Sequence, residues 1–230
     1  MTRRPIAPTL FPDMAPSVAR RGVLPDLLYG TIPNVWAQIV THYVPPRIPL
    51  PVIADLTCRD GEMWKHCASG YRVLRFDVDP SVTPDAVADC RWPAMRRSSC
   101  EAVVVDVPWS LDPGKGRGYA ASRYGSRFTS VAQVLGLFRG ANWAPCVRDG
   151  GWAFVRCQAS HHGGKPVMLP QRIVPRVEDG SAWELWDEAV HMMGNPGAQA
   201  AMKDPPKLRY GTSRFLVFRK TKTKIPFLHG

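Results

Sequence analysis

Four short, apolar-rich segments, each closed by an aspartate, constrain the fold of this 230-residue chain most strongly. Segments of this kind, separated by turns and helical patterns, are typical of strands buried on both faces of a parallel sheet. Such a sheet needs helices on both sides, so the pattern predicts an α/β fold. The segments are residues 51–54, 71–76, 86–88 and 102–105, and the aspartates that follow them are Asp55, Asp77, Asp89 and Asp106.

Three further segments have sequence patterns typical of helices. The first should begin at Asn34 and end before Pro45, because proline cannot continue a helix. Two capping boxes, each a serine three residues before Gln or Glu, predict the other two helices. These boxes are Ser130 with Gln133, and Ser181 with Glu184, the latter followed by the apolar positions Leu185, Trp186, Ala189, Val190 and Met193.

Two more strands complete the expected sheet, at residues 152–157 and 214–218, and we expect residues 158–180 to be irregular. The length suits a single α/β domain with a full core. We therefore expect an irregular Pro/Arg-rich N-terminal arm at residues 1–31, one domain at residues 32–220, and a basic C-terminal tail at residues 221–230.

The chain carries a formal net charge of +11, and its basic residues are clustered. Clustered positive charge favours a polyanionic partner, and nucleic acid is the usual one. The alternative, that the charge only keeps the protein soluble, stays open. The groups are Arg91, Arg96 and Arg97, then Lys115, Arg117, Arg123 and Arg127, and last a C-terminal group between Lys203 and Lys224.

The six cysteines predict neither a disulfide framework nor a metal site. They contain no C-x-x-C pair, and their intervals fit no common zinc pattern. We expect them to be buried structural thiols. No apolar stretch approaches the ~20 residues that span a bilayer, so we expect no membrane partner and a cytoplasmic location.

The strand-terminal aspartates predict a ligand site, because ligands of open parallel sheets bind beyond the carboxyl ends of the strands. Asp77 lies 22 residues after Asp55, near the interval expected of a carboxylate that binds ribose hydroxyls. No G-x-G-x-x-G turn follows Asp55, which weighs against a dinucleotide. The pattern suits a ligand with a ribose, a base and a charged amino-acid tail.

At these motifs, over about residues 32–220, the chain resembles the S-adenosylmethionine-dependent methyltransferases that modify exocyclic amino groups of DNA or RNA. The resemblance implies a class I methyltransferase fold, Rossmann-like, with a mainly parallel seven-stranded sheet and helices on both faces. It implies S-adenosyl-L-methionine as the cofactor. It also implies cofactor contacts from Asp55, Leu56, Thr57, Cys58 and Gly61 in a first motif, from Asp77 and Val78 in a second, and from Asp89 and Cys90 beside the adenine. Arg59 stands where the family often has another glycine.

The tetrapeptide Asp106-Val107-Pro108-Trp109 resembles the family's D-P-P-[YFW] catalytic motif. The resemblance implies that Asp106 and the Val107 carbonyl accept hydrogen bonds from the target amine, while Trp109 stacks on the base. Valine supplies the same carbonyl as the family's proline but lacks its fixed φ, so packing must hold the loop. The implied reaction is methyl transfer to N6 of adenine, in preference to N4 of cytosine.

Basic and aromatic residues alternate in the glycine-rich segment that follows, which suits contact with a nucleic-acid backbone. No separate target-recognition domain is visible, which favours either a protein partner for target recognition or modest sequence specificity. Two alternatives stay open: a catalytically inactive nucleic-acid-binding subunit, and a small-molecule or protein methyltransferase. The predicted nucleic-acid-binding residues are Lys115, Arg117, Tyr119, Arg123, Tyr124 and Arg127.

Overall fold

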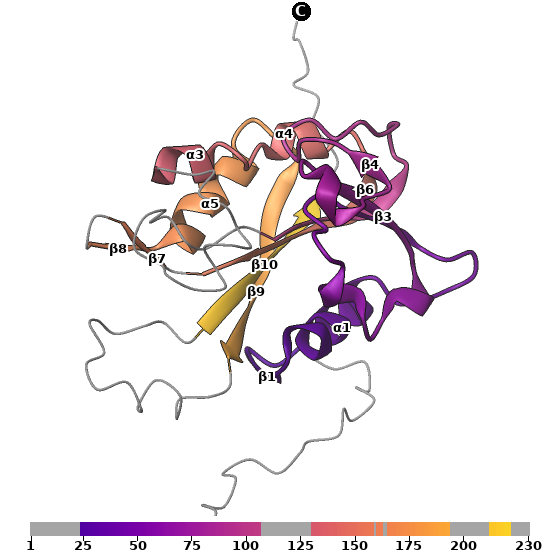
Figure 1. Ribbon diagram of the computed structural model, residues 1–230, viewed down its shortest axis with the longest axis horizontal. Helices are drawn as coiled ribbons and strands as arrows, with labels where there is room; N and C mark the ends of the chain where they lie inside the picture. Colours follow the sequence, from indigo (N-terminus) through magenta and orange to yellow (C-terminus); the bar gives the residue numbers. More distant parts are fainter. Residues whose placement is uncertain (1–23, 107–129, 159, 163–164, 194–211, 222–230) are drawn as a thin grey trace, which may run out of the picture.

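The computed structural model describes residues 24–106, 130–158, 160–162, 165–193 and 212–221. These residues form one eight-stranded sheet in the order β1-β9-β10-β6-β5-β2-β3-β4, with a small β7-β8 hairpin beside it (Figure 1). The strands are β1 (Leu27–Gly30), β2 (Val52–Asp55), β3 (Arg72–Asp77), β4 (Ala86–Val87), β5 (Cys100–Asp106), β6 (Val147–Cys157), β7 (Ser160–His162), β8 (Lys165–Val167), β9 (Trp183–Met193) and β10 (Thr212–Lys220).

Five of the seven strand pairs in the described sheet are parallel, and β10 runs antiparallel to both of its neighbours. The prediction of a mainly parallel sheet is therefore confirmed. The sheet differs from the expected one in having eight strands instead of seven, with mixed direction at β10.

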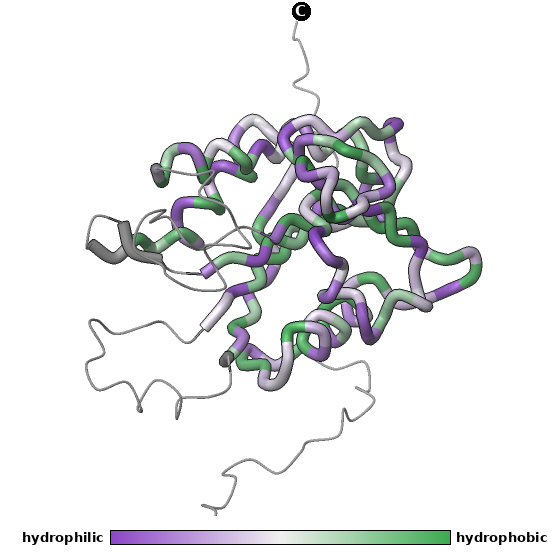
Figure 2. Tube along the Cα trace, in the orientation of Figure 1, coloured by the Kyte–Doolittle hydropathy of each residue, from purple (hydrophilic) through white to green (hydrophobic). Residues whose placement is uncertain are grey.

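Helices cover both faces of the sheet (Figure 1). The described helices are α1 (Ile32–Tyr43), α3 (Val131–Leu135), α4 (Gly140–Trp143) and α5 (Leu169–Glu178), with 3₁₀ turns η1 (Glu62–Trp64), η2 (Ala68–Gly70) and η3 (Pro80–Val82). Helices α3, α4 and α5 pack on one face, where Phe138, Trp143 and Ile173 are buried. On the other face α1 buries Trp36 and Ile39. Figure 2 shows that α1 and α5 each carry both hydrophobic and hydrophilic residues, as helices at a sheet surface should.

The predicted helix near Asn34 is confirmed as α1, which begins two residues earlier, at Ile32. Its apolar face packs tightly: the Trp36 ring meets the rings of Trp64 and Phe154 edge-on, each at 5.2 Å between centroids. The cap at Ser130 is also confirmed, because its hydroxyl accepts a hydrogen bond from the backbone N–H of Gln133, at 3.2 Å.

The helix predicted after Ser181 is wrong, because this segment forms the long strand β9. Opposite β9, Val217 pairs with Asp187 and Phe218 with Leu185, so Trp186 is an extra, bulged residue. A bulge reverses which alternate positions face each side of a sheet. Leu185 accordingly packs in the cluster under α5, whereas Ala189 packs in the cluster under α1. The apolar positions before and after the bulge, read together along the sequence, therefore have the spacing of a helix although the segment is a strand.

The hydroxyl of Ser181 serves the end of α5 instead of starting a helix. It donates to the carbonyl of Val177 at 2.5 Å and accepts from the backbone N–H of Trp183 at 3.2 Å. Serine at a helix end can satisfy a free carbonyl in this way.

Two segments expected to be irregular contain regular structure. Residues 27–30, within the predicted N-terminal arm, form β1 and pair parallel with β9. Residues 169–178 form α5, and the β7-β8 hairpin precedes it. Leu169, Ile173 and Val177 are buried at helical spacing, but Pro170 in the first turn and Pro175 inside the helix obscured that period.

All six cysteines are free and buried, which confirms their prediction as structural thiols. Burial raises the pKa of the Cys58 thiol to about 12, so this sulfur stays protonated at neutral pH. No helix in the described part of the chain is both long and apolar enough to cross a membrane.

Candidate functional site

The carboxyl ends of β2, β3 and β5 lie side by side, and their backbones are joined beyond the strands. The N–H of Leu56 donates to the carbonyl of Val104, and the N–H of Cys58 donates to the carbonyl of Phe76, both at 2.9 Å. The Thr57 hydroxyl accepts a hydrogen bond from the backbone N–H of Asp106, at 2.7 Å. The loop after β2 therefore bridges the ends of β3 and β5.

Asp55 is buried at the end of β2, with 1% of its surface exposed. One carboxylate oxygen accepts from the Trp64 indole N–H at 2.7 Å, and the other from the backbone N–H of Thr57 at 3.2 Å. Burial raises the pKa of the Asp55 carboxyl from its ordinary value of 3.8 to about 7, and these hydrogen bonds only partly oppose the shift. Asp55 thus organises the loop from inside the protein.

Asp77 holds the same loop from the end of β3. Its Oδ2 accepts from the backbone N–H of Arg59 at 3.0 Å, and its Oδ1 accepts from that of Asp79 at 2.9 Å. Arg59 has φ = 48° and Gly61 has φ = 70°, both in the left-handed region that glycine favours. Arg59, at a position where the family often has glycine, thus keeps the left-handed backbone conformation that a glycine would adopt there. Asp79 caps η3 through Ser81, as a turn residue does.

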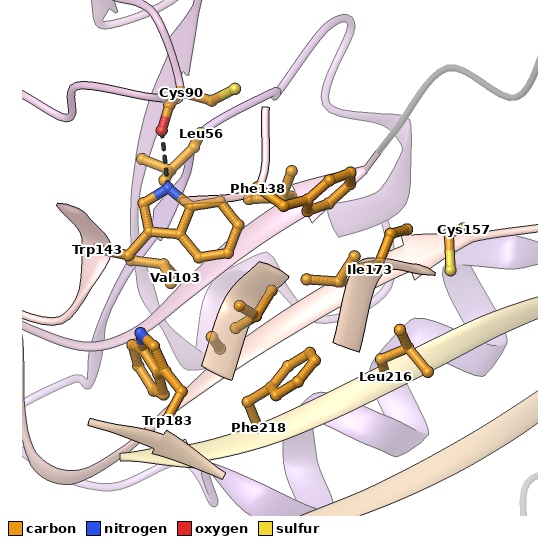
Figure 3. Packing of buried hydrophobic residues seen from close by; sticks show 14 of the residues in the cluster. Leu56, Cys90, Val103, Phe138, Trp143, Cys157, Ile173, Trp183, Leu216 and Phe218 are labelled. Carbon is orange, nitrogen blue, oxygen red and sulfur yellow. Dashed lines mark hydrogen bonds between the residues drawn. The ribbon is translucent and has the colours of Figure 1, made fainter. Parts of the chain in front are cut away.

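Beyond β4, the predicted adenine-side residues Asp89 and Cys90 form a fixed turn. The Arg91 guanidinium donates to both Asp89 oxygens, through Nε at 3.0 and 2.9 Å, and holds the pKa of that carboxyl below its ordinary value. The carbonyl of Cys90 accepts from the indole N–H of Trp143 at 2.8 Å, as Figure 3 shows. Val78, from the second motif, is 53% exposed after β3.

Asp106 ends β5 and pairs with a residue that the sequence analysis missed, Arg156 on β6. Nη1 of Arg156 lies 3.1 and 2.9 Å from the two Asp106 oxygens. The Arg156 side chain is 8% exposed, against 22% for Asp106. Two buried polar atoms nearby in sequence, Nε of Arg156 and Oε1 of Gln158, have no hydrogen-bond partner among the described residues. The register that places Arg156 opposite Asp106 is a long-range property of the sheet.

The remaining predicted site residues lie outside the described residues. They are Val107, Pro108 and Trp109 of the tetrapeptide, and Lys115, Arg117, Tyr119, Arg123, Tyr124 and Arg127 of the basic segment. Within the described ranges, no group of three or more His, Cys, Asp or Glu side chains could hold a metal ion.

Together the described residues form a carboxylate-rich edge suited to a polar, hydroxyl-bearing ligand. Each oxygen of Asp77 already accepts one backbone N–H, but a carboxylate oxygen has two lone pairs. Asp77 is 8% exposed, so these second lone pairs are the acceptors that a hydroxyl-bearing ligand would have to reach. At Gly61 an added Cβ would meet no atom of the described residues within 4 Å, so among these residues the loop is open on that side.

No protein-family model matches the chain, and no curated protein matches it. Solved structures do resemble it. A putative sarcosine dimethylglycine methyltransferase from Galdieria sulphuraria is 10% identical, with a TM-score of 0.53 over 82% of this chain and 85% of that one. A geranyl diphosphate methyltransferase, solved with GPP and sinefungin, is 9% identical, with a TM-score of 0.52 over 82% of this chain and 78% of that one.

The [4+2]-cyclase SpnF is also similar, at 9% identity and a TM-score of 0.51 over 82% of each chain. At such low identity these likenesses show the fold alone. The chain has the Rossmann-like fold of class I methyltransferases, as the sequence analysis expected. Because the fold also occurs in a protein named as a cyclase, the reaction must be argued from the site.

Proposed function

We propose that the protein is an S-adenosylmethionine-dependent methyltransferase, and that its acceptor is an exocyclic amino group, N6 of adenine in DNA or RNA. The observation that carries this proposal is the hydrogen bond between the backbone N–H of Asp106 and the Thr57 hydroxyl. It links the loop proposed to bind the cofactor to the strand end proposed to bind the amine. Methyl transfer needs these two ligands in contact, at about 3–3.5 Å between the reacting atoms.

The hydrogen-bonding groups at the strand ends suit this cofactor. Asp77, which is 8% exposed, would accept from two ribose hydroxyls, and the methionine part would lie on the open side of the loop at Gly61. Asp89 and Cys90 would line the adenine side. When bound, the cofactor supplies an electrophilic methyl group on a sulfonium sulfur.

The chain's own task is to position the acceptor amine. Conjugation with the ring delocalises the lone pair of such an amine and makes it a weak nucleophile. A hydrogen bond from its N–H to Asp106 favours a pyramidal nitrogen. Nη1 of Arg156 uses one lone pair on each Asp106 oxygen, and a carboxylate offers about four in all. Asp106 can therefore accept from the amine while Arg156 fixes its orientation.

Two measurements test the proposal. Calorimetry with S-adenosylmethionine should give saturable binding, and labelled methyl groups should appear on N6-methyladenine in DNA or RNA. Asp106→Ala should keep cofactor binding but lower methyl transfer by about 100-fold or more, because the amine loses its acceptor. Asp179→Ala, at an exposed aspartate after α5, is the matched control and should behave as wild type. Full activity in Asp106→Ala would overturn the assignment.

A small-molecule acceptor is the second candidate. It is favoured by the similar structures named for dimethylglycine and geranyl diphosphate methyltransferases, although they share only the fold. The Arg156 guanidinium beside Asp106 would also suit an acceptor that carries a carboxylate. Incubation of the enzyme and labelled cofactor with nucleic acid, free nucleosides and small amines, in parallel, separates the two candidates.

A further inference from the structure

A cavity of about 600 Å³ opens at the amino ends of β2, β3 and β5, the opposite edge of the sheet from the proposed active site. Glu101, in its wall, and Asp106 are five residues apart on one strand, so the two sites are about 16 Å apart. Nothing in the proposed methyl transfer uses this cavity.

Three exposed arginines line the cavity: Arg47, Arg72 and Arg148. Glu101 is the only acidic residue among the described residues of its lining. That carboxylate accepts from Arg47 at 2.6 Å and lies 3.3 Å from Arg148, and it also accepts from the backbone N–H of Val52 at 2.7 Å. One carboxylate against three guanidinium groups leaves the lining with an excess of two positive charges.

The rim increases this excess. Arg96 and Arg97 are exposed immediately before Ser98, which lines the cavity with φ = 50°. The backbone N–H of Ser98 donates to the carbonyl of Pro145 at 2.8 Å, so the rim is tied to the segment before β6. The acidic Asp149 next to Arg148 is itself paired with Lys220 at 3.2 Å.

We infer that this cavity is a binding site for a ligand that carries two or more phosphate groups. Each guanidinium has five N–H donors, and contact with Glu101 uses only a fraction of those on Arg47 and Arg148. Planar guanidinium groups bind phosphate oxygens in pairs of parallel hydrogen bonds, better than lysine does. Glu101 contacts both Arg47 and Arg148 through its Oε1 and so holds these two guanidinium groups close together before the ligand arrives. The phosphates belong either to a free polyphosphate or nucleotide, or to the backbone of a nucleic acid.

Two probes distinguish these sources. Calorimetry measures the affinity for inorganic tripolyphosphate, and fluorescence anisotropy measures the affinity for a single-stranded oligonucleotide of about 12 nucleotides. We expect saturable binding of tripolyphosphate at about 50 mM salt, where exposed charges are weakly screened. A backbone-binding site should bind both probes, with the oligonucleotide competing for the tripolyphosphate. A site for a free ligand should bind tripolyphosphate alone.

Arg72→Glu places a second carboxylate in the lining and should weaken tripolyphosphate binding by at least about tenfold. Arg72→Gln, which only removes the charge, should weaken it less, and an unchanged urea denaturation curve of Arg72→Glu excludes a folding defect as the cause. The matched control is Arg176→Glu, an identical charge change at an exposed position on α5, which should change the affinity less than about twofold. Equal losses in Arg72→Glu and Arg176→Glu, or no saturable binding by wild type, would refute the inference. Cofactor calorimetry on the same samples reports on the proposed methyltransferase separately.

Discussion

At the scale of single residues, Asp55 couples the candidate site to pH. Its pKa in the folded protein is about 7, against 3.8 ordinarily, because burial disfavours the charged form. Between about pH 4 and 7 the folded state therefore binds more protons at this residue than the unfolded state. The contribution of Asp55 to the free energy of unfolding therefore falls as pH rises through that window. It is fully lost above about pH 7.

Asp55→Asn should flatten this dependence, since asparagine has no charge to bury. We expect wild type to lose more unfolding free energy than the variant between about pH 4 and 8, measured by urea denaturation. The substitution Asp179→Asn at an exposed site should leave the wild-type profile unchanged. Parallel profiles for wild type and Asp55→Asn would show that Asp55 does not titrate as its burial implies.

Arg156 offers a second prediction at this scale. Arg156→Ala leaves Asp106 without its partner, so we expect a loss of roughly 2 kcal/mol in unfolding free energy. Arg156→Lys keeps a positive charge but cannot repeat the guanidinium geometry, so it should recover only part of the loss. Urea denaturation of the three proteins at neutral pH provides the comparison, and equal stability of wild type and Arg156→Ala would contradict it.

How much of the site the sequence predicts depends on how local its signals are. The aspartates at strand ends are local, and Asp55, Asp77 and Asp106 do end β2, β3 and β5 on neighbouring strands. The partner of Asp106 is not local, because Arg156 reaches it only through the register of β5 on β6. Trp64 lies only nine residues after Asp55, but no pattern between them predicts that its indole N–H donates to an Asp55 oxygen.

At the scale of elements, α4 supports the turn on the proposed adenine side. The indole N–H of Trp143 donates to the carbonyl of Cys90. Trp143→Phe keeps an aromatic ring but leaves that buried carbonyl without its donor, at a cost of about 1–3 kcal/mol. It should also weaken S-adenosylmethionine binding, because the turn carrying Asp89 loses its anchor.

Trp183→Phe is the matched control for this change. Trp183 is also buried in the same cluster, and its indole N–H donates to the carbonyl of Gly140 at 2.8 Å (Figure 3 shows both tryptophans). Urea denaturation should show similar destabilisation in the two variants, whereas calorimetry should show weaker cofactor binding only in Trp143→Phe. Equal cofactor affinities of the Trp143→Phe and Trp183→Phe proteins would show that α4 does not support the cofactor site.

Predicting elements from sequence succeeded where one periodicity held throughout a segment. The run on α1 keeps one apolar face from Val35 to Val40, and it is a helix. Strand β9 changes phase at Trp186, which imitates a helix, and α5 contains prolines that disguise one. The error at β9 arises because a local pattern does not reveal its pairing with β10. The error at α5 arises because a local pattern does not reveal its packing on the face of the sheet.

At the scale of the whole molecule, the net charge of +11 predicts salt-sensitive association with polyanions. If the three arginines of the cavity each neutralise one phosphate of a single strand, log affinity should fall with log salt concentration at a slope of about −2 or steeper. Anisotropy titrations with the oligonucleotide at several salt concentrations give this slope. A slope near zero would mean that the charge does not contact the phosphates.

The short strand β1 bears on whether the sheets of separate molecules can pair along their edges. An eleven-residue strand such as β9, left at the border of a sheet, would offer unpaired N–H groups on which another chain could assemble. Here β1 pairs with residues 190–193, while side chains of Ser181, Glu178 and Asp187 accept from the N–H groups of Trp183, Leu185 and Glu188. The border strands of the described sheet are β1, with four residues, and β4, with two, so residues 183–189 of β9 and 72–75 of β3 have no strand on their outer side. Short border strands, and side chains that accept the outward N–H groups of β9, are features that disfavour edge-to-edge pairing of sheets, so we expect little such pairing through β9.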